Sequence, residues 1–287
     1  MYMFKRVLKT IGLCIAALLI GTVAQLLGLA IGDLMTKSGL PAAAGIAASS
    51  ILYPLLTFIG IKLAFGKVFK LDTKDMRIGR PRFKYYWIGI AIVLPLMVTA
   101  VYQFMSGHWT MCDQEDILSL TAGGILFTGL AAGISEEMIF RGAIMGSIEK
   151  EFNTKSAVMI PSVAFAAVHI AGRSLDLLSI VLLMAAGTLV GVMFSLIEIE
   201  SGSFWNNALV HAMWNMVILG ILHTDSNPSD GYVFTYVLDS KSVLVTGGDF
   251  GIESSLIATV SYFAVIVIAA VLILTGKSQS KAAKGIC

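Results

Sequence analysis

Residues 117–148 read ILSLTAGGILFTGLAAGISEEMIFRGAIMGSI, an apolar run that is interrupted by three charged side chains, Glu136, Glu137 and Arg141. A bilayer core about 30 Å thick is crossed by about 20 apolar residues in helical form, so this run is long enough to span a membrane. An ionisable side chain near the middle of such a helix costs about 2.5 to 3.5 kcal/mol. The three charges therefore indicate a buried polar site inside a membrane protein.

The rest of the chain has the composition of a polytopic membrane protein. It contains 287 residues, of which 57% are hydrophobic and only 13% are charged, and its mean hydropathy is +0.85. The formal net charge of +2 is too small to indicate a nucleic-acid partner. Cys14, Cys112 and Cys287 lie far apart in the sequence, so they predict neither a set of disulfide bonds nor a metal site formed by closely spaced cysteines. The partner indicated by the composition is the lipid bilayer.

Apolar segments of roughly membrane-spanning length follow one another along the chain and predict an all-α, polytopic membrane fold with about eight transmembrane helices. The basic residues cluster at the N-terminus, in the linker 67–84 and in the C-terminal tail, which is typical of cytoplasmic segments. An even number of spans places all three on one side. We therefore predict a multi-pass protein of a bacterial or archaeal plasma membrane, with both termini cytoplasmic and the first span retained. The predicted spans are residues 11–33, 41–65, 86–105, 117–148, 155–172, 177–197, 204–223 and 254–275.

The spans divide the chain into three predicted parts. These are the first three helices in residues 1–116, a core of helices four to seven in residues 117–223, and an extracytoplasmic loop with the last helix and a basic tail in residues 224–287. Glycines recur at a spacing of four residues in the core, a pattern that lets helices pack closely in lipid. The pairs are Gly129 with Gly133, Gly142 with Gly146, and Gly187 with Gly191.

Helical geometry separates the roles of the three charges in the fourth span. Glu137 lies one turn before Arg141, which is the favourable order for an ion pair within a helix. Glu136 is rotated by about 100° from Glu137 around the helix axis, so it can face a cavity without a salt-bridge partner of its own. A carboxylate in that position is suited to accept a proton from water and to pass it on.

Two other spans carry polar side chains that could line the same cavity. Phe165 and His169 lie one turn apart in the fifth span, and His211 and Asn215 lie one turn apart in the seventh. Together with Glu136 they supply a base, two imidazoles and an amide donor, the groups needed for attack of water on a peptide carbonyl. Taken singly, each has a structural alternative, because paired charges, histidines and asparagines also hold membrane helices together.

These three motifs, in this order and on separate spans, resemble the CPBP intramembrane protease family, which includes the type II CAAX prenyl endopeptidases and bacteriocin-processing and immunity proteins of the Abi group. The family pattern of Glu-Glu-x-x-x-Arg, Phe-x-x-x-His and His-x-x-x-Asn reads here as 136–141, 165–169 and 211–215. The resemblance covers roughly residues 120 to 220. It implies a helical bundle that encloses an intramembrane catalytic cavity, open toward the cytoplasmic side, and an endopeptidase that forms no covalent intermediate.

The resemblance also implies a role for each matching residue. Glu136 would activate water, His169 would position or polarise it, and His211 with Asn215 would form the oxyanion hole. The supporting residues Glu137, Arg141 and Phe165 would shape the site. The substrate would be a membrane-associated protein or peptide, with prenylated proteins as the family precedent. Family members are described both as glutamate-dependent and as metalloproteases, and we favour a reaction without a cofactor. In the alternative, zinc would be bound by Glu136, His169 and His211.

Other classes of function remain open. Buried acids and histidines also serve as proton relays in ion-coupled transporters. Many such transporters contain internal repeats, which this sequence does not show. A non-catalytic bacteriocin-immunity protein could bind a membrane peptide in the same cavity. Outside the motifs, we interpret His108 and His223 as interfacial, and Glu198 and Glu200 as solvated side chains at a membrane boundary.

Overall fold

The computed structural model describes residues 2–68, 70–72, 75–113 and 117–284. The basic side chains predicted in the C-terminal tail, and Cys287, lie outside the described side chains. Within these described residues, six helices are long and apolar enough to cross a membrane. They are α1 (Tyr2–Lys37), α2 (Ala42–Leu63) with its extension η1 (Ala64–Val68), α3 (Tyr85–Gln103), the continuous helix from Ile117 to Glu151, α8 (Leu177–Ser201) and α11 (Leu256–Lys284). The all-α polytopic membrane fold is confirmed.

Two shorter helical segments complete the bundle. The first is α7 (Thr154–Val168), and the second is α9 (Phe204–Trp214), which continues as η4 (Asn215–Ile221). All eight predicted spans are helical, but α7 has only 15 residues. At 1.5 Å per residue such a helix is about 22 Å long, less than the hydrocarbon thickness, so the number of complete crossings stays a prediction.

The helix that carries the three charges is wound unevenly. It consists of α4 (Ile117–Ala122), η2 (Gly123–Ala132), α5 (Gly133–Glu137), η3 (Met138–Ile144) and α6 (Met145–Glu151), of which η2 and η3 are π-helical. Glu136 and Glu137 lie in the short α-helical piece between the two π-helical stretches. Such stretches are rare and frequently occur at functional sites.

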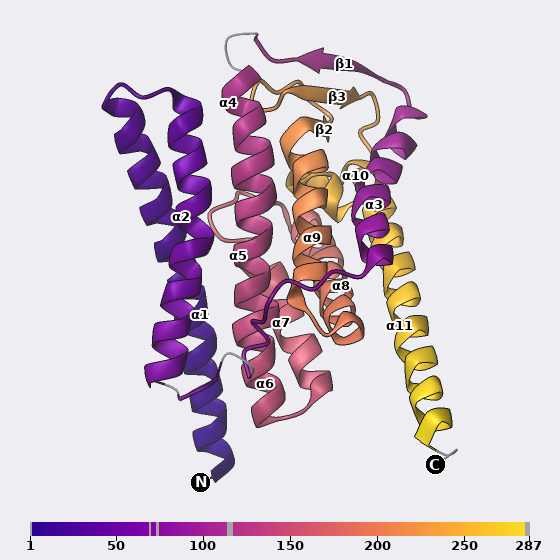
Figure 1. Ribbon diagram of the computed structural model, residues 1–287. Coiled ribbons are helices and arrows are strands. Elements are labelled where there is room, and N and C mark those ends of the chain that lie inside the picture. Colours follow the sequence, from indigo (N-terminus) through magenta and orange to yellow (C-terminus); the bar gives the residue numbers. More distant parts are fainter. Residues whose placement is uncertain (1, 69, 73–74, 114–116, 285–287) are drawn as a thin grey trace.

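A small sheet covers one end of the bundle (Figure 1), where only loops were predicted. Its strands are β1 (Gly107–Met111), β2 (Leu222–Asp225) and β3 (Phe234–Leu238), in the order β1-β3-β2. The central strand pairs antiparallel with β1 and parallel with β2. Its sequence FTYVL is rich in aromatic and β-branched residues, which favour strands. The short elements α10 (Val243–Thr246), η5 (Gly248–Phe250) and η6 (Ile252–Ser254) follow it.

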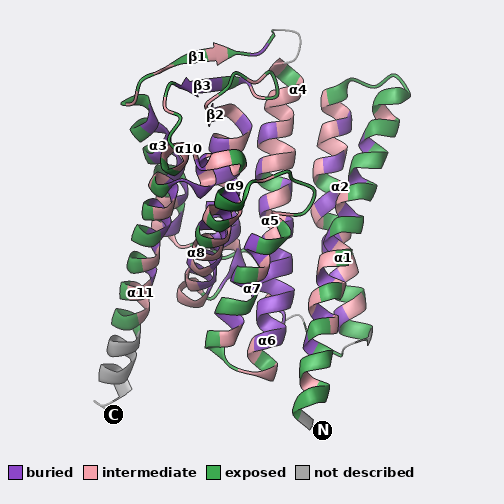
Figure 2. Cartoon of the chain, turned by 180° about the vertical axis from the view of Figure 1, so that it is seen from behind, coloured by how far each residue is buried: buried purple, intermediate pink, exposed green. Residues whose placement is uncertain are grey.

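The helix α9 is at the centre of the packing. Its first half contributes Phe204 and Ala208 to a buried apolar cluster shared with α1, η3, α6 and α7. Its second half contributes Val210 and Trp214 to a second cluster shared with α3, α8 and α11. Exposed apolar side chains lie on the outer helices, notably α1 and α11 (Figure 2), where lipid would contact them. Polar residues on α9 therefore lie in the interior of the molecule.

Four of the six predicted glycines lie against a neighbouring helix. A Cβ atom added at Gly191 of α8 would lie 2.7 Å from Cα of Ser162 in α7, and one at Gly133 would lie 2.8 Å from Cα of Ala212 in α9. Gly129 and Gly187 also face neighbouring helices, whereas Gly142 and Gly146 lie against the linker at residues 75–78. Close packing at glycine is therefore confirmed, but one pair accommodates a loop and not a helix.

We expect Gly191→Ala to lower the thermal unfolding midpoint of the purified protein, because the added methyl group would overlap backbone atoms of α7. Overpacking of this kind costs about 1 to 3 kcal/mol. The matched control is Gly89→Ala on α3, where nothing lies within 4 Å of the added Cβ and where alanine improves helix propensity. Equal shifts for the two variants would contradict close packing at Gly191.

The linker before α3 is tied to the bundle at the end opposite the sheet. Arg77 forms ion pairs with Glu149 and with Glu198, the second over 3.3 Å. Glu200 accepts hydrogen bonds from Lys84 and from the indole of Trp87, each over 2.7 Å. The interpretation of Glu198 as solvated is wrong, because its side chain is only 1% exposed. Its charge is buried because the linker folds back over the end of α8.

Candidate active site

A cavity of about 450 Å³ lies between α5, α7, α8 and α9. Five of the seven predicted site residues line it. Four of them lie in α5, α7, α9 and η4, and the fifth directly follows the last residue of α7. These five are Glu136, Phe165, His169, His211 and Asn215. Glu137 and Arg141 lie behind this lining, and both side chains are completely buried.

Glu137 is held by three donors. Its Oε1 atom lies 3.0 Å from Nη1 of Arg141 and 2.9 Å from Nδ1 of His211, and its Oε2 atom accepts a hydrogen bond of 2.6 Å from Nδ2 of Asn207. The predicted pairing of Glu137 with Arg141 is therefore present. Asn207 was missed, although its position one helical turn before His211 placed it on the same face of α9. Glu137 anchors α5 to α9 and has little freedom to act as a base.

Arg141 completes this buried framework. Its Nη2 atom donates a hydrogen bond of 3.1 Å to the carbonyl oxygen of Gly191 in α8. Its guanidinium lies over the rings of Phe165 and Phe194, at 4.8 and 5.1 Å from their centroids. Cation–π contacts of a desolvated arginine contribute about 2 kcal/mol or more. Arg141 thus joins the charged helix to both α7 and α8.

Glu136 occupies the position predicted for the free carboxylate. Its side chain is 26% exposed, and its Oε2 atom lies 3.8 Å from Nε2 of His211. The two nitrogens of His211 are therefore differently placed, since Nδ1 faces Glu137 and Nε2 faces Glu136 and the cavity. A stacked ring of Phe194, with centroids 4.8 Å apart, fixes the plane of the imidazole.

His169 lies where α7 ends. Its Nδ1 atom is 2.7 Å from the carbonyl oxygen of Phe165, and because a carbonyl can only accept, Nδ1 must carry the proton. The Nε2 atom is then an acceptor in the neutral ring. In the predicted span 155–172, His169 would lie close to the end that is distant from Glu136; instead, the short helix ends inside the bundle and brings the imidazole to the cavity that Glu136 lines.

Asn215 begins the π-helical stretch η4 and donates a hydrogen bond of 3.0 Å from Nδ2 to the carbonyl oxygen of Thr128 in η2. This bond uses one of its two amide hydrogens. The second hydrogen is available to a ligand in the cavity. Asn215, one turn after His211, is thus oriented by Thr128 and has a second amide hydrogen to donate to a ligand.

Residues from the segment after β3 also line the cavity, and the motifs gave no signal for them. Glu253 accepts a hydrogen bond of 3.3 Å from Nε1 of Trp214. Burial raises the pKa of this carboxyl, and the nearby His169 opposes that shift. Phe250 places its ring edge-on to His169, with centroids 6.2 Å apart. The segment before the last helix, predicted only as an extracytoplasmic loop, therefore contributes a second carboxylate to the site.

Glu136, His169 and His211 have side chains of the types that bind zinc, and three such ligands would have to lie around one point. Among the residues that the structure describes, no three His, Cys, Asp or Glu side chains are grouped closely enough to hold one. Glu136, His169 and His211 are therefore not grouped as a zinc site in this structure, and the reaction without a cofactor stays a prediction.

Comparison with known proteins places this site in a family. Residues 118–217 match the model of the type II CAAX prenyl endopeptidase Rce1-like family. No curated protein and no solved structure matches the chain. The matched segment contains the cavity-lining residues Glu136, Phe165, His169, His211 and Asn215. Members of this family act on membrane-associated protein substrates, and the helices make this chain a multi-pass integral membrane protein. Through residues 118–217, the chain is therefore similar to the type II CAAX prenyl endopeptidases, and this match supports its membership of the CPBP family of intramembrane proteases.

Proposed function

We propose that this protein is an intramembrane endopeptidase in which Glu136 activates water for attack on a peptide bond of a membrane-associated protein or peptide. The observation that carries the proposal is the convergence of Glu136, His169, His211 and Asn215 on one cavity. Glu137 supports it as well, because its three donors leave Glu136 as the carboxylate that faces the cavity.

The placement of these groups supports the following reaction. Glu136 takes a proton from water, and the resulting hydroxide adds to the scissile carbonyl carbon. The negative charge that develops on the carbonyl oxygen is stabilised by the second amide hydrogen of Asn215 and by Nε2–H of His211. The histidine fills this role in its doubly protonated form, with Nδ1–H donated to Glu137. His169 orients the water through Nε2, and Glu136 returns its proton to the leaving amine as the carbon–nitrogen bond breaks.

The test uses the purified protein in lipid vesicles, supplied with peptides from a membrane proteome. Mass spectrometry should find new peptide termini, whereas the intact mass of the protein during turnover should show no acyl adduct. Absence of new termini would overturn the proposal. Treatment with a strong chelator should leave cleavage intact; a loss of activity that one equivalent of metal restores would refute the metal-free mechanism but keep the protease.

A further inference from the structure

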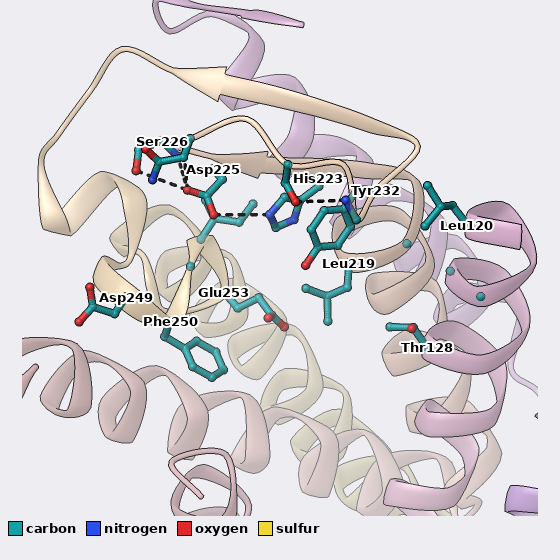
Figure 3. Close-up of a pocket in the computed structure, with 18 of the residues that line it drawn as sticks. Leu120, Thr128, Leu219, His223, Asp225, Ser226, Tyr232, Asp249, Phe250 and Glu253 are labelled. Carbon is teal, nitrogen blue, oxygen red and sulfur yellow. Dashed lines mark hydrogen bonds and ion pairs between the residues drawn. The ribbon is translucent and has the colours of Figure 1, made fainter. Parts of the chain in front are cut away.

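A second and larger cavity lies at the sheet end of the molecule (Figure 3). We call it the outer chamber; its volume is about 1160 Å³, and the catalytic cavity is called the inner chamber. The outer chamber is lined by the start of η2, the end of η4, the residues from β2 to Tyr232 and the segment 246–253. Nearly all of these elements lie outside the motifs that define the proposed active site.

The two chambers are adjacent. Five residues line both of them, namely Thr128, Arg173, Leu219, Phe250 and Glu253. Thr128 is the residue whose carbonyl oxygen accepts the hydrogen bond from the Asn215 amide. These shared residues form the border between the two chambers, so a ligand in the outer chamber lies next to the polar groups of the inner chamber.

Phe250 marks the boundary between the chambers. One side of its ring contacts the imidazole of His169, and the guanidinium of Arg173 lies 4.7 Å from its centroid. Arg173 forms no ion pair with a carboxylate among the described residues. An apolar ring with a cation beside it thus separates the catalytic groups from the larger space.

The backbone fixes this boundary in place. Gly247 and Gly251, on either side of the η5 turn, have φ angles of 79° and 104°, which only glycine adopts readily. The amide of Asp249 donates a hydrogen bond of 2.9 Å to Oγ of Ser179 at the start of α8. The turn that carries Phe250 is consequently anchored to the start of α8.

Polar groups dominate the far wall of the outer chamber. His223 stacks on Tyr232, with ring centroids 3.6 Å apart, and its Nε2 atom lies 3.6 Å from Oδ2 of Asp225. The neighbouring imidazole of His223 holds the pKa of the Asp225 carboxyl below its usual value. Ser226 and Asn227 continue this wall. Such a surface favours a hydrated ligand over a lipid chain.

The sheet end is also the end that lacks the basic clusters. The N-terminus, the linker before α3 and the end of α11 all lie at the opposite end (Figure 1), and basic segments are typical of the cytoplasmic side. None of the residues that line the inner chamber belongs to the described part of the linker, residues 67–68, 70–72 and 75–84.

We infer that the outer chamber binds the hydrophilic segment of the peptide substrate, which reaches the catalytic residues from the sheet end past the ring of Phe250. This inference rests on the proposed proteolytic function. The occupant is an extended, hydrated stretch of polypeptide, since the wall offers hydrogen-bonding groups and a volume of about 1160 Å³ holds a short peptide segment but not a folded domain.

The inference is tested by single cysteines in a variant without Cys14, Cys112 and Cys287. Ser226→Cys places a thiol on the wall of the outer chamber, and the matched control Ser242→Cys places one at the same end but outside the chamber lining. A bulky, membrane-impermeant thiol reagent is added to proteoliposomes, and the cleavage rate of each variant is compared before and after labelling. We expect labelling of Ser226→Cys to cause loss of cleavage and labelling of Ser242→Cys to leave the rate unchanged.

Sidedness is measured in intact cells with the same reagent. Ser226→Cys should be labelled without permeabilisation, whereas Lys155→Cys, at the exposed start of α7, should be labelled only after it. Full labelling of Ser226→Cys with no loss of cleavage overturns the inference but leaves the protease intact, and so does labelling only after permeabilisation. Absence of cleavage in the unlabelled Ser242→Cys control and in the wild type would instead contradict the proposed function.

Discussion

Replacing Glu136 by glutamine is expected to lower kcat by about 10² to 10⁴, the usual contribution of a general acid–base group. The amide has the shape of the carboxylate but cannot accept a proton from water. Substrate binding should persist, because Glu136 makes no hydrogen bond that holds the helices together; its contact with His211 spans 3.8 Å. The measurement is single-turnover cleavage of a membrane peptide, with binding followed separately by cross-linking.

The matched control is Glu151→Gln near the end of the same continuous helix, where the carboxylate pairs with Lys9 on the surface. It should cleave at the wild-type rate. If Glu136→Gln folds and retains full biological activity, a non-catalytic role such as peptide binding by an immunity protein becomes the better account. Retained binding with lost cleavage is the result that supports the protease.

The second large effect is expected on stability. Arg141→Met would leave the Glu137 carboxylate buried without its cation, and breaking a buried ion pair in this way costs about 3 to 5 kcal/mol. Methionine preserves the contacts with the surrounding rings but cannot donate to Gly191. The expected result is a large fall in the free energy of unfolding, measured by denaturant titration in mixed micelles.

Two controls separate the buried charge from lost packing. The double variant Glu137→Gln/Arg141→Met contains no unpaired charge, so it should regain part of the lost stability in a double-mutant cycle. Lys37→Met breaks the pair with Asp33, which has the same spacing but is exposed; such pairs contribute about 0.2 to 1 kcal/mol. A similar loss in Arg141→Met and Lys37→Met would show that burial of the first pair is unimportant.

Local spacing explains which parts of the site could be predicted. The pairing of Glu137 with Arg141 and the different orientation of Glu136 follow from 3.6 residues per turn, and both are present in the structure. The role of Asn207 could not be predicted from spacing within one helix, because it depends on how α9 packs against α5. The catalytic roles assigned to Glu136, His169, His211 and Asn215 stay predictions until variants are measured.

Features that depend on tertiary packing could not be predicted from the spacing of apolar and polar residues along the chain. The stretch FTYVL of β3 reads as a strand only when β1 and β2 are available to pair with it. Glu253 was assigned to a loop because it lies between apolar segments, and nothing local indicates that this loop folds back to Trp214. The burial of Glu198 likewise depends on Arg77, a residue distant in the chain.

The incomplete length of α7 has a consequence for the border of the proposed reaction site. The chain that follows α7 bonds within the protein instead of with lipid or a further helical turn: the amides of Ile170, Ala171 and Arg173 close turns, and that of Asp176 donates to Oδ2 of Asp249. Ala171 and Arg173 also line the inner chamber. The proposed reaction site is therefore bordered here by a short segment of turns in place of a complete apolar helix.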